Sequence, residues 1–228
     1  MATTIPLVVG VFAPVSTSTT LASNLACGGR RGQSPLTLIK TEKSFLNIYS
    51  GEEYADLILK CIAEVEDELV ANKPLRMYGK TVFQRRSIGF FSNESIGYYY
   101  SGQLERAKPL KSNSSKLMQL LNERFGLKNN AFLVNKYIGG ENYISDHSDD
   151  EQNIDKGGVI AISHGAVRKF RIRDKLTKKI IMDIPTTSGS IIHMGGDFQK
   201  EFTHGIPVEK KVEGIRYSFT GRKHINSA

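Results

Sequence analysis

Two histidines and one aspartate have the residue types and the spacing of a metal site. His147 and Asp149 are two residues apart, and an extended backbone points such side chains toward the same face. His204 lies in residues 202–207, after a glycine-rich turn, and could supply a third ligand. Two imidazoles and one carboxylate hold non-haem Fe(II) and leave positions open for substrate and dioxygen. A His-x-Asp pair beside an acidic run is weak evidence alone, because such a run is usually a solvated loop.

A second pattern lies in residues 216–222, where polar side chains alternate strictly with other residues. One face of a strand there would carry Arg216, Ser218, Thr220 and Arg222. Guanidinium groups pair bidentately with carboxylates, so two arginines at the ends of one face suit a ligand with a carboxylate at each end. Asn135 and Tyr137, also two apart, could add an amide and a phenol hydroxyl from a neighbouring strand. The alternative is a solvated edge strand.

Taken in order along the chain, these motifs resemble those of the AlkB family of Fe(II)- and 2-oxoglutarate-dependent dioxygenases. The order is Asn135-x-Tyr137, His147-x-Asp149, His204 and Arg216-x-Ser-x-Thr-x-Arg222. The similarity extends over about residues 74–222, and four separated motifs in register are specific where each alone would be weak. Ser218 departs from several family members, which have Asn at this position.

The resemblance implies a set of ligands and an activity. Fe(II) would be bound by the catalytic residues His147, Asp149 and His204. The co-substrate 2-oxoglutarate would be bound by Asn135, Tyr137, Arg216, Ser218, Thr220 and Arg222. We expect Arg216 to hold the carboxylate farther from the metal. Dioxygen would be consumed, with ascorbate as a supporting reductant, and N-methyl groups of nucleic-acid bases would leave as formaldehyde.

The same resemblance predicts a nucleotide-recognition region. Aromatic rings stack on an extruded or unpaired base while Lys and Arg hold phosphates, as base-modifying enzymes require. The candidate residues are Tyr78, Lys80, Arg85, Arg86, Tyr98, Tyr100, Glu151, Phe170 and Arg173. For the tyrosine run, a core strand with Tyr98 and Tyr100 pointing inward is an equally good interpretation.

Hydrophobic periodicity predicts the elements that position these motifs. Helical spacing covers residues 52–70 and 112–125, the second with Asn113 as a cap and an end near Gly126. Short β-rich runs follow at residues 131–138, 158–163, 169–173, 179–184, 190–194 and 215–222. This spacing predicts a sandwich or jelly roll with helices packed outside. The family resemblance implies an α+β fold, a double-stranded β-helix (jelly roll) with flanking N-terminal helices.

The chain divides into three parts, the first by its composition and the other two by periodicity and by the family resemblance. Residues 1–43 are expected to be a flexible leader or linker, because residues 1–41 contain no Asp or Glu; a transit peptide is the alternative. Residues 44–125 would hold the N-terminal helices and the nucleotide-recognition region. Residues 126–224 would form the dioxygenase core, and 44–224 together one domain.

The whole composition favours an intracellular protein with a polyanionic partner. The 228 residues carry a formal net charge of +8, and Lys and Arg near phosphates release condensed counterions. No apolar run approaches the about 20 residues of a membrane span. Two cysteines are too few for a disulfide framework, which favours the reducing cytoplasm. Expected partners are methylated RNA or single-stranded DNA, with the chain a monomer or part of a longer polyprotein.

The likeness is greatest to AlkB domains in replication polyproteins of plant RNA viruses, which favours RNA as substrate. Three alternatives stay open: a 2-oxoglutarate oxygenase for proteins or small molecules, a non-catalytic nucleic-acid-binding module, and a zinc-binding jelly roll. The remaining histidines are expected to have other roles. His164 and His193 should be packing or hydrogen-bonding residues, and His224 should lie in a tail.

Overall fold

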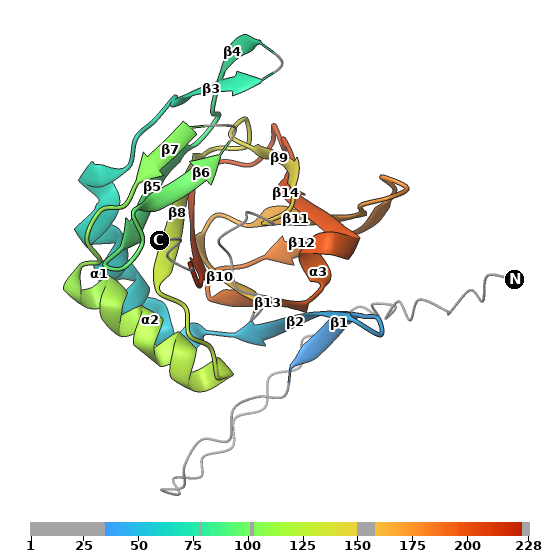
Figure 1. Cartoon of the computed structure of the whole chain (residues 1–228), viewed down its shortest axis with the longest axis horizontal. Coiled ribbons are helices and arrows are strands. Elements are labelled where there is room, and N and C mark those ends of the chain that lie inside the picture. The colour runs from blue at the N-terminus through green and yellow to red at the C-terminus, as the bar shows by residue number, and fades with distance from the viewer. Residues whose placement is uncertain (1–34, 78, 101–102, 150–157, 225–228) are drawn as a thin grey trace, which may run out of the picture.

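Two antiparallel sheets face each other in the computed structural model, which describes residues 35–77, 79–100, 103–149 and 158–224 (Figure 1). The seven-stranded sheet has the order β1 (Leu36–Lys40), β2 (Ser44–Ser50), β13 (Ser190–Gly196), β10 (Val159–Gly165), β15 (Ile215–Arg222), β8 (Ala131–Ile138), β5 (Ser87–Ser92). The four-stranded sheet has the order β12 (Ile180–Thr186), β11 (Arg168–Asp174), β14 (Phe202–Ile206), β9 (Ile144–His147). The predicted jelly-roll fold is confirmed.

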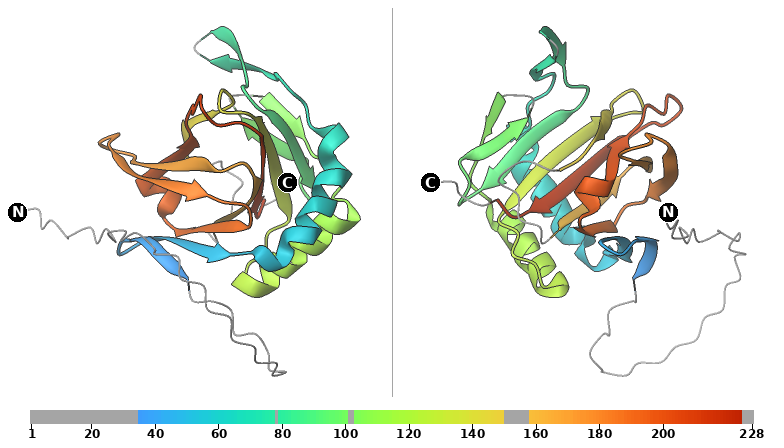
Figure 2. Two further views of the ribbon diagram at one scale, coloured as in Figure 1. Left: turned by 180° about the vertical axis from the view of Figure 1, so that it is seen from behind. Right: turned by 45° about the vertical axis from the view of Figure 1, so that its right-hand side comes forward.

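Two helices cover the outer face of the large sheet (Figure 2). They are α1 (Ala55–Val65), with single 3-10 turns at Glu52–Tyr54 and Glu66–Glu68, and α2 (Ser112–Phe125). A short helix, α3 (Phe198–Glu201), joins β13 to β14. Two hairpins, β3 (Pro74–Met77) with β4 (Lys80–Phe83) and β6 (Gly97–Tyr100) with β7 (Gln103–Arg106), complete the described elements. The β3–β4 hairpin projects from the body of the molecule (Figure 1).

The alternation of side chains along the large sheet creates two cores. One lies between the two sheets and includes Tyr137, Phe170 and Met194. The other lies between the large sheet and the helices, where Phe132 and Phe219 meet the apolar faces of α1 and α2. Successive residues of a strand point to opposite faces, so the same strands that pack on the helices also line the interior between the sheets.

The N-terminal end of α2 is stabilised differently from the prediction. Asn113 was expected to cap the helix, but the helix begins at Ser112 after Lys111, and no side chain of the cap residue bonds to it. Instead the carboxylate of Glu64, from α1, accepts hydrogen bonds from the backbone N–H groups of Asn113 and Ser114 at 3.0 and 3.2 Å. An acidic side chain there also favours the positive end of the helix dipole. Gly126 ends the helix at φ 64°, as expected for a C-terminal glycine.

Several predicted bounds were wrong. Residues 36–40, assigned to the leader, form β1 and pair with β2. The first helix is shorter than residues 52–70, because regular α-helix covers only Ala55–Val65. Residues 44–125 contain β2 to β7 as well as helices. His224 is not in a free tail, since it is buried and its backbone bonds to Asn130 at 2.8 Å.

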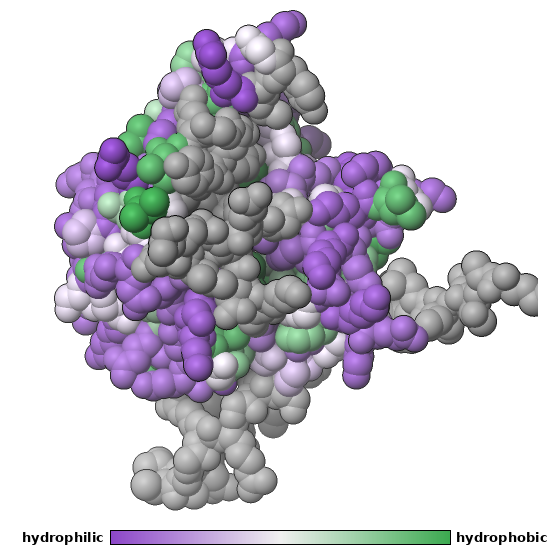
Figure 3. Space-filling model, in the orientation of Figure 1, coloured by the Kyte–Doolittle hydropathy of each residue, from purple (hydrophilic) through white to green (hydrophobic). Residues whose placement is uncertain are grey.

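Hydrophilic residues make up most of the coloured surface on the face that Figure 3 shows. In the view of Figure 3, apolar residues occur in small separate groups among polar ones. The longest described helix, α2, has 14 residues, and none of the described helices has the length and apolar character of a membrane span.

Candidate active site

The three predicted metal ligands come together at the edge of the small sheet. His147 ends β9, Asp149 follows two residues later, and His204 lies in β14, paired in register with His147. One ligand atom from each side chain lies within 4.8 Å of the others. The Nε2 atoms of His147 and His204 are 3.7 and 3.6 Å from the two carboxylate oxygens of Asp149. This spacing allows all three side chains to share one ion.

The electrostatic state of this cluster fits a divalent metal. Burial alone would raise the pKa of Asp149, but the guanidinium of Arg222 and the two imidazoles lower it to about 2. Burial, and after it the neighbouring His147, lower the pKa of His204 to about 3. An ionised carboxylate and neutral imidazoles are the protonation states that metal ligands require. In addition, Asp149 Oδ2 is buried and accepts no hydrogen bond, which leaves it available to an ion.

Neighbouring groups hold the ligands in place. The Nδ1 atom of His147 lies 2.9 Å from the carbonyl oxygen of Ser145, which leaves Nε2 to face Asp149. Ser148 donates to the carbonyl of Phe202 at 3.0 Å, and the backbone N–H of Asp149 donates to Gln199 Oε1, also at 3.0 Å. Gln199 belongs to α3, so this short helix fixes the segment that carries the carboxylate. Such outer contacts orient metal ligands.

The predicted co-substrate residues line the same cavity as the metal ligands. All six are buried: Asn135, Tyr137, Arg216, Ser218, Thr220 and Arg222. Strand β15 is central, between β10 and β8, and its register places Arg216 opposite Tyr137 and Ser218 opposite Asn135. The alternative of a solvated edge strand is therefore wrong.

The two arginines stand at opposite ends of this face. Arg222 donates to Asp149 Oδ1 at 2.8 Å, which places it at the metal end. Arg216 is at the other end, where it donates to Thr186 Oγ1 at 3.3 Å and to Ser163 Oγ at 2.9 Å. Its Nη1 atom is buried and has no partner. The two cationic ends are thus separated along one strand, as a ligand with a carboxylate at each end would require.

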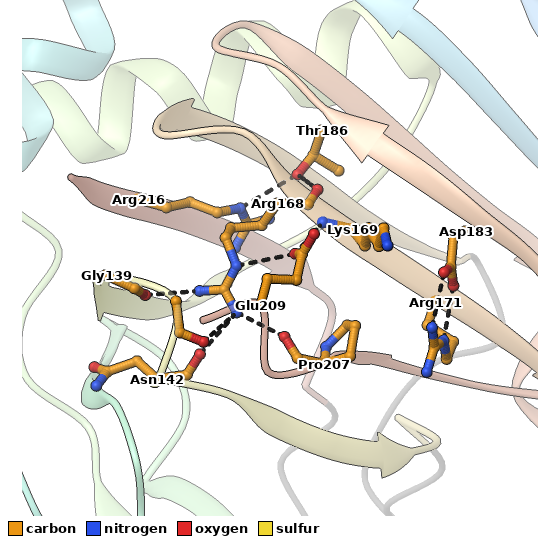
Figure 4. A network of polar contacts seen from close by, with 11 residues as sticks. Gly139, Asn142, Arg168, Lys169, Arg171, Asp183, Thr186, Pro207, Glu209 and Arg216 are labelled. Atoms are coloured by element: carbon orange, nitrogen blue, oxygen red, sulfur yellow. Dashed lines mark hydrogen bonds and ion pairs between the residues drawn. The ribbon is translucent and has the colours of Figure 1, made fainter. Parts of the chain in front are cut away.

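Arg168 is a second buried arginine, and it has the carboxylate partner that Arg216 lacks among the described residues. Arg168 is 1% exposed and forms an ion pair with Glu209 at 3.1 Å. Its guanidinium also donates to the carbonyl oxygens of Gly139, Asn142 and Pro207 at 2.7–2.9 Å (Figure 4). Arg216 has no carboxylate partner among the described residues, and its burial lowers its pKa because the charged form loses hydration. A buried cation without a counterion favours an anionic ligand.

The residues predicted to bind substrate are more scattered. Phe170 lines the cavity and stacks on His204 with ring centroids 5.1 Å apart. Arg173 pairs with Asp146, next to His147, at 2.6 Å. Lys80 and Arg85 are exposed on or near β4. Tyr78 and Glu151 lie outside the described residues, and for Tyr98 and Tyr100 only the backbone, in β6, is described.

Arg86 was expected on a phosphate-facing surface, and that placement was wrong. It is 5% exposed, and its Nε atom donates to Asn135 Oδ1 at 2.7 Å. The sequence also gave no signal for Gln199 and Arg168, because neither belongs to a motif and their contacts join segments that are distant in the chain. Met194 and Ile144 line the cavity as ordinary apolar strand residues.

The other histidines lie apart from the cavity. His164 Nδ1 is 2.9 Å from Ser188 Oγ, and His193 packs edge-on against Phe45 and Phe125, in agreement with the predicted packing and hydrogen-bonding roles. His224 packs against Phe90. Among the described residues, His147, Asp149 and His204 form the one group with metal-ligand geometry.

Comparison with known proteins agrees with this geometry. Residues 44–222 match the family described as the 2OG-Fe(II) oxygenase superfamily. DNA oxidative demethylase ALKBH2 of Homo sapiens is 26% identical over 188 residues, covering 79% of this chain and 72% of that protein. Alpha-ketoglutarate-dependent dioxygenase alkB homolog 3 of Bos taurus is 30% identical over 115 residues, covering 46% and 40%.

A solved structure of OsALKBH1 has the same fold, with a TM-score of 0.51 at 14% identity, covering 83% of this chain and 100% of that one. The predicted AlkB resemblance is confirmed, whereas the likeness to viral AlkB domains stays a prediction. The chain belongs to the 2OG-Fe(II) oxygenase superfamily and is an AlkB-family dioxygenase, which uses Fe(II), 2-oxoglutarate and dioxygen.

Proposed function

We propose that this dioxygenase removes methyl groups from N-methylated bases of nucleic acid, with RNA favoured over DNA. The observation that carries the proposal is one cavity that is lined by His147, Asp149 and His204 and also by Arg216. Arg216 is buried and has no carboxylate partner among the described residues. Fe(II) and 2-oxoglutarate held there would activate dioxygen, which is the oxidant for a methyl group. The AlkB relatives named above support a nucleic-acid substrate.

The residues of the cavity have distinct proposed roles. His147, Asp149 and His204 hold Fe(II), and Arg222 keeps the Asp149 carboxylate ionised. Arg216 binds the distal carboxylate of 2-oxoglutarate, with Asn135, Tyr137, Ser218 and Thr220 donating or accepting hydrogen bonds along the same face. Because these groups are fixed by sheet pairing, the site is organised before the ligand arrives.

Charge and shape support binding to a nucleic acid. The chain has a net charge of +8, and the projecting β3–β4 hairpin carries exposed Arg76 and Lys80. Phe83 on the same hairpin is 60% exposed, and the strand register places it on the same face as Arg76, which offers an aromatic surface for a base and a cation for a phosphate. Phe170, beside His204, offers an aromatic wall for a base that enters the cavity. An oxygenase for small metabolites has no need of this basic and aromatic hairpin.

The preference for RNA is supported by the sequence resemblance to viral AlkB domains, while the ALKBH2 relatives are named for DNA. The same proposal places the protein in the cytoplasm, as a monomer or within a longer polyprotein. The buried free thiol of Cys61 is compatible with a reducing compartment.

One assay tests the proposal. The protein is incubated with Fe(II), ascorbate and 2-oxoglutarate together with single-stranded RNA or DNA of one sequence, methylated at one base. Formaldehyde and the repaired base should form with both, and faster with RNA. Equal or faster repair of DNA would overturn the RNA preference. Succinate production that depends on a peptide or metabolite, without base repair, would favour the alternative oxygenase class. Binding without any turnover would favour a non-catalytic module.

A further inference from the structure

Arg86 is a buried guanidinium beside the co-substrate face. It precedes β5, which pairs with β8 so that Ile88 lies opposite Asn135. Its Nε atom donates to Asn135 Oδ1 at 2.7 Å in a buried hydrogen bond. No ion pair joins Arg86 to a carboxylate in the described part of the chain, so Asn135 is its principal polar partner there. Burying a guanidinium costs free energy, and one hydrogen bond to an amide offsets little of that cost, so a functional role for Arg86 is expected.

The chemistry of the two side chains fixes the orientation of the amide. Arginine carries N–H donors and no acceptor, so only the oxygen of Asn135 can face it. The Nδ2 group of Asn135 must then point away from Arg86. Asn135 lines the cavity next to the metal ligands, so the group left over for the cavity is a pair of N–H donors. Without Arg86, the amide could turn over and present its oxygen instead.

We propose that Arg86 is a positioning residue that locks the Asn135 amide with its N–H donors toward the co-substrate. This inference rests on the proposed assignment of Asn135 to 2-oxoglutarate. An amide oxygen at this point would repel a carboxylate or keto oxygen, whereas the N–H donors bind one. With Arg216 and Arg222 on the neighbouring strand, the face presents donors to a dianionic ligand.

Strand pairing restrains both partners of the Arg86–Asn135 hydrogen bond. Asn135 lies in the middle of β8, which is bonded on one side to β5 and on the other to β15. Arg86 lies just outside the pairing of β5, whose register with β8 begins at Ser87. The pairing of β5 with β8 therefore holds the guanidinium of Arg86 against the amide of Asn135. In the chain, Arg86 comes three residues after the end of the β3–β4 hairpin.

A double-mutant cycle tests whether Arg86 acts through Asn135. Binding of 2-oxoglutarate is measured by titration of the Mn(II)-loaded protein without oxygen, for the wild type, Arg86→Met, Asn135→Ala and the double variant. Arg86→Met should raise the dissociation constant about tenfold, as loss of a charged hydrogen bond does. In the Asn135→Ala background the same change should have an effect of less than about twofold, because coupled residues are not additive. An equal rise in both backgrounds would overturn the proposal.

Conservative variants separate positioning from folding. Arg86→Lys keeps a donor and should recover part of the affinity. Asn135→Asp keeps a partner for Arg86 but turns the donors into an acceptor, so the fold should persist while 2-oxoglutarate binding falls at least as far as in Asn135→Ala. Wild-type affinity of Asn135→Asp would contradict the inference. Turnover should show a raised Michaelis constant for 2-oxoglutarate with little change in kcat.

Two further variants complete the test. Arg124→Met removes a guanidinium from α2, where it pairs with Glu53, and should leave 2-oxoglutarate binding unchanged. If Asn135→Ala and Arg216→Lys both bind 2-oxoglutarate like the wild type, the assignment of the whole face fails and the role of Arg86 fails with it. If those two variants lose affinity while Arg86→Met does not, only the positioning role is overturned.

Discussion

Arg222 and Asp149 form a buried ion pair, with Nη2 and Oδ1 2.8 Å apart and both side chains 1% exposed. The pair joins Arg222, the last residue of β15, to the carboxylate of the metal cluster. A change of charge at the end of this strand therefore acts directly on a metal ligand. The buried Asp149 carboxylate has lost its hydration and therefore depends on neighbouring positive charge, from Arg222 or from a bound metal ion.

The first prediction concerns removal of one member of this pair. Arg222→Met leaves the Asp149 carboxylate buried with a much weaker counter-charge, which should cost about 3–5 kcal/mol of the free energy of unfolding of the metal-free protein. Mn(II) supplies a positive charge at the same carboxylate, so metal should stabilise the variant more than the wild type. Chemical unfolding with and without Mn(II) measures both effects.

A matched control is Arg171→Met, which breaks a partly exposed pair with Asp183. An exposed pair contributes about 0–1 kcal/mol, so this change should be mild and independent of Mn(II). Equal destabilisation by the two substitutions would contradict the dependence of Asp149 on Arg222.

The second prediction is that His147→Ala, Asp149→Ala and His204→Ala each abolish turnover while the protein remains folded. Each removes a metal ligand, and Asp149→Ala also removes the buried ion pair with Arg222, so stability should fall most in that variant. Far-ultraviolet circular dichroism checks the fold, and Mn(II) titration checks the metal site. A metal chelator should likewise stop turnover of the wild type reversibly.

For comparison, His193→Ala removes a ring packed between Phe45 and Phe125 and should lower stability with residual activity and intact metal binding. Loss of metal binding in this variant, or near-wild-type turnover in any of the three ligand variants, would mean that the cluster was assigned wrongly.

Much of this site was predictable because its signals are local. The strict alternation of residues 216–222 predicts one polar face, and the structure shows that face buried between the sheets. The His-x-Asp spacing is local as well: His147 is the last residue of β9, Asp149 follows two residues later, and the two side chains come together. The helix at 112–125 and the strands at 131–138 and 215–222 have the predicted bounds because each ends at a turn residue or a change in periodicity.

The unpredicted features depend on contacts between distant segments. Arg86 has the composition of a surface residue, and only the pairing of β5 with β8 brings it to Asn135. The cap of α2 by Glu64 requires α1 to lie beside it. Strand β1 consists of five residues without a charge pattern that distinguishes them from the preceding segment, so only its pairing with β2 defines it.

The third prediction is a pH dependence at Glu66, which follows α1. Burial would raise the pKa of Glu66, but the ammonium of Lys136 and the hydroxyl of Tyr217, which donates to it at 2.6 Å, lower the pKa below its usual value of 4.5. Because the folded state holds the charged form more strongly, the contribution to stability is present above pH 4.5 and is lost as the pH falls below it.

Glu66→Gln should therefore destabilise the protein at pH 7 more than near pH 3.5, as measured by urea unfolding at the two pH values. Glu123→Gln, which alters an exposed carboxylate on α2 bonded to Gln119, serves as the control and should show a smaller change. A Glu66→Gln effect that grows as the pH falls would contradict the assigned direction.

The last prediction concerns Arg216, whose proposed partner is the distal carboxylate of 2-oxoglutarate. Arg216→Lys keeps the positive charge but removes the planar pair of donors that now spans Thr186 and Ser163. Loss of a buried, charge-assisted contact costs about 2–5 kcal/mol, which corresponds to a rise of at least about 30-fold in the Michaelis constant for 2-oxoglutarate. Mn(II) binding should survive, because Arg216 stands at the end of the face away from Asp149. Steady-state kinetics with varied 2-oxoglutarate and Mn(II) titration separate the two ligands. An unchanged Michaelis constant in a folded Arg216→Lys protein would leave the unpartnered Nη1 atom without a ligand, and the dicarboxylate site would then have to be placed elsewhere on the face.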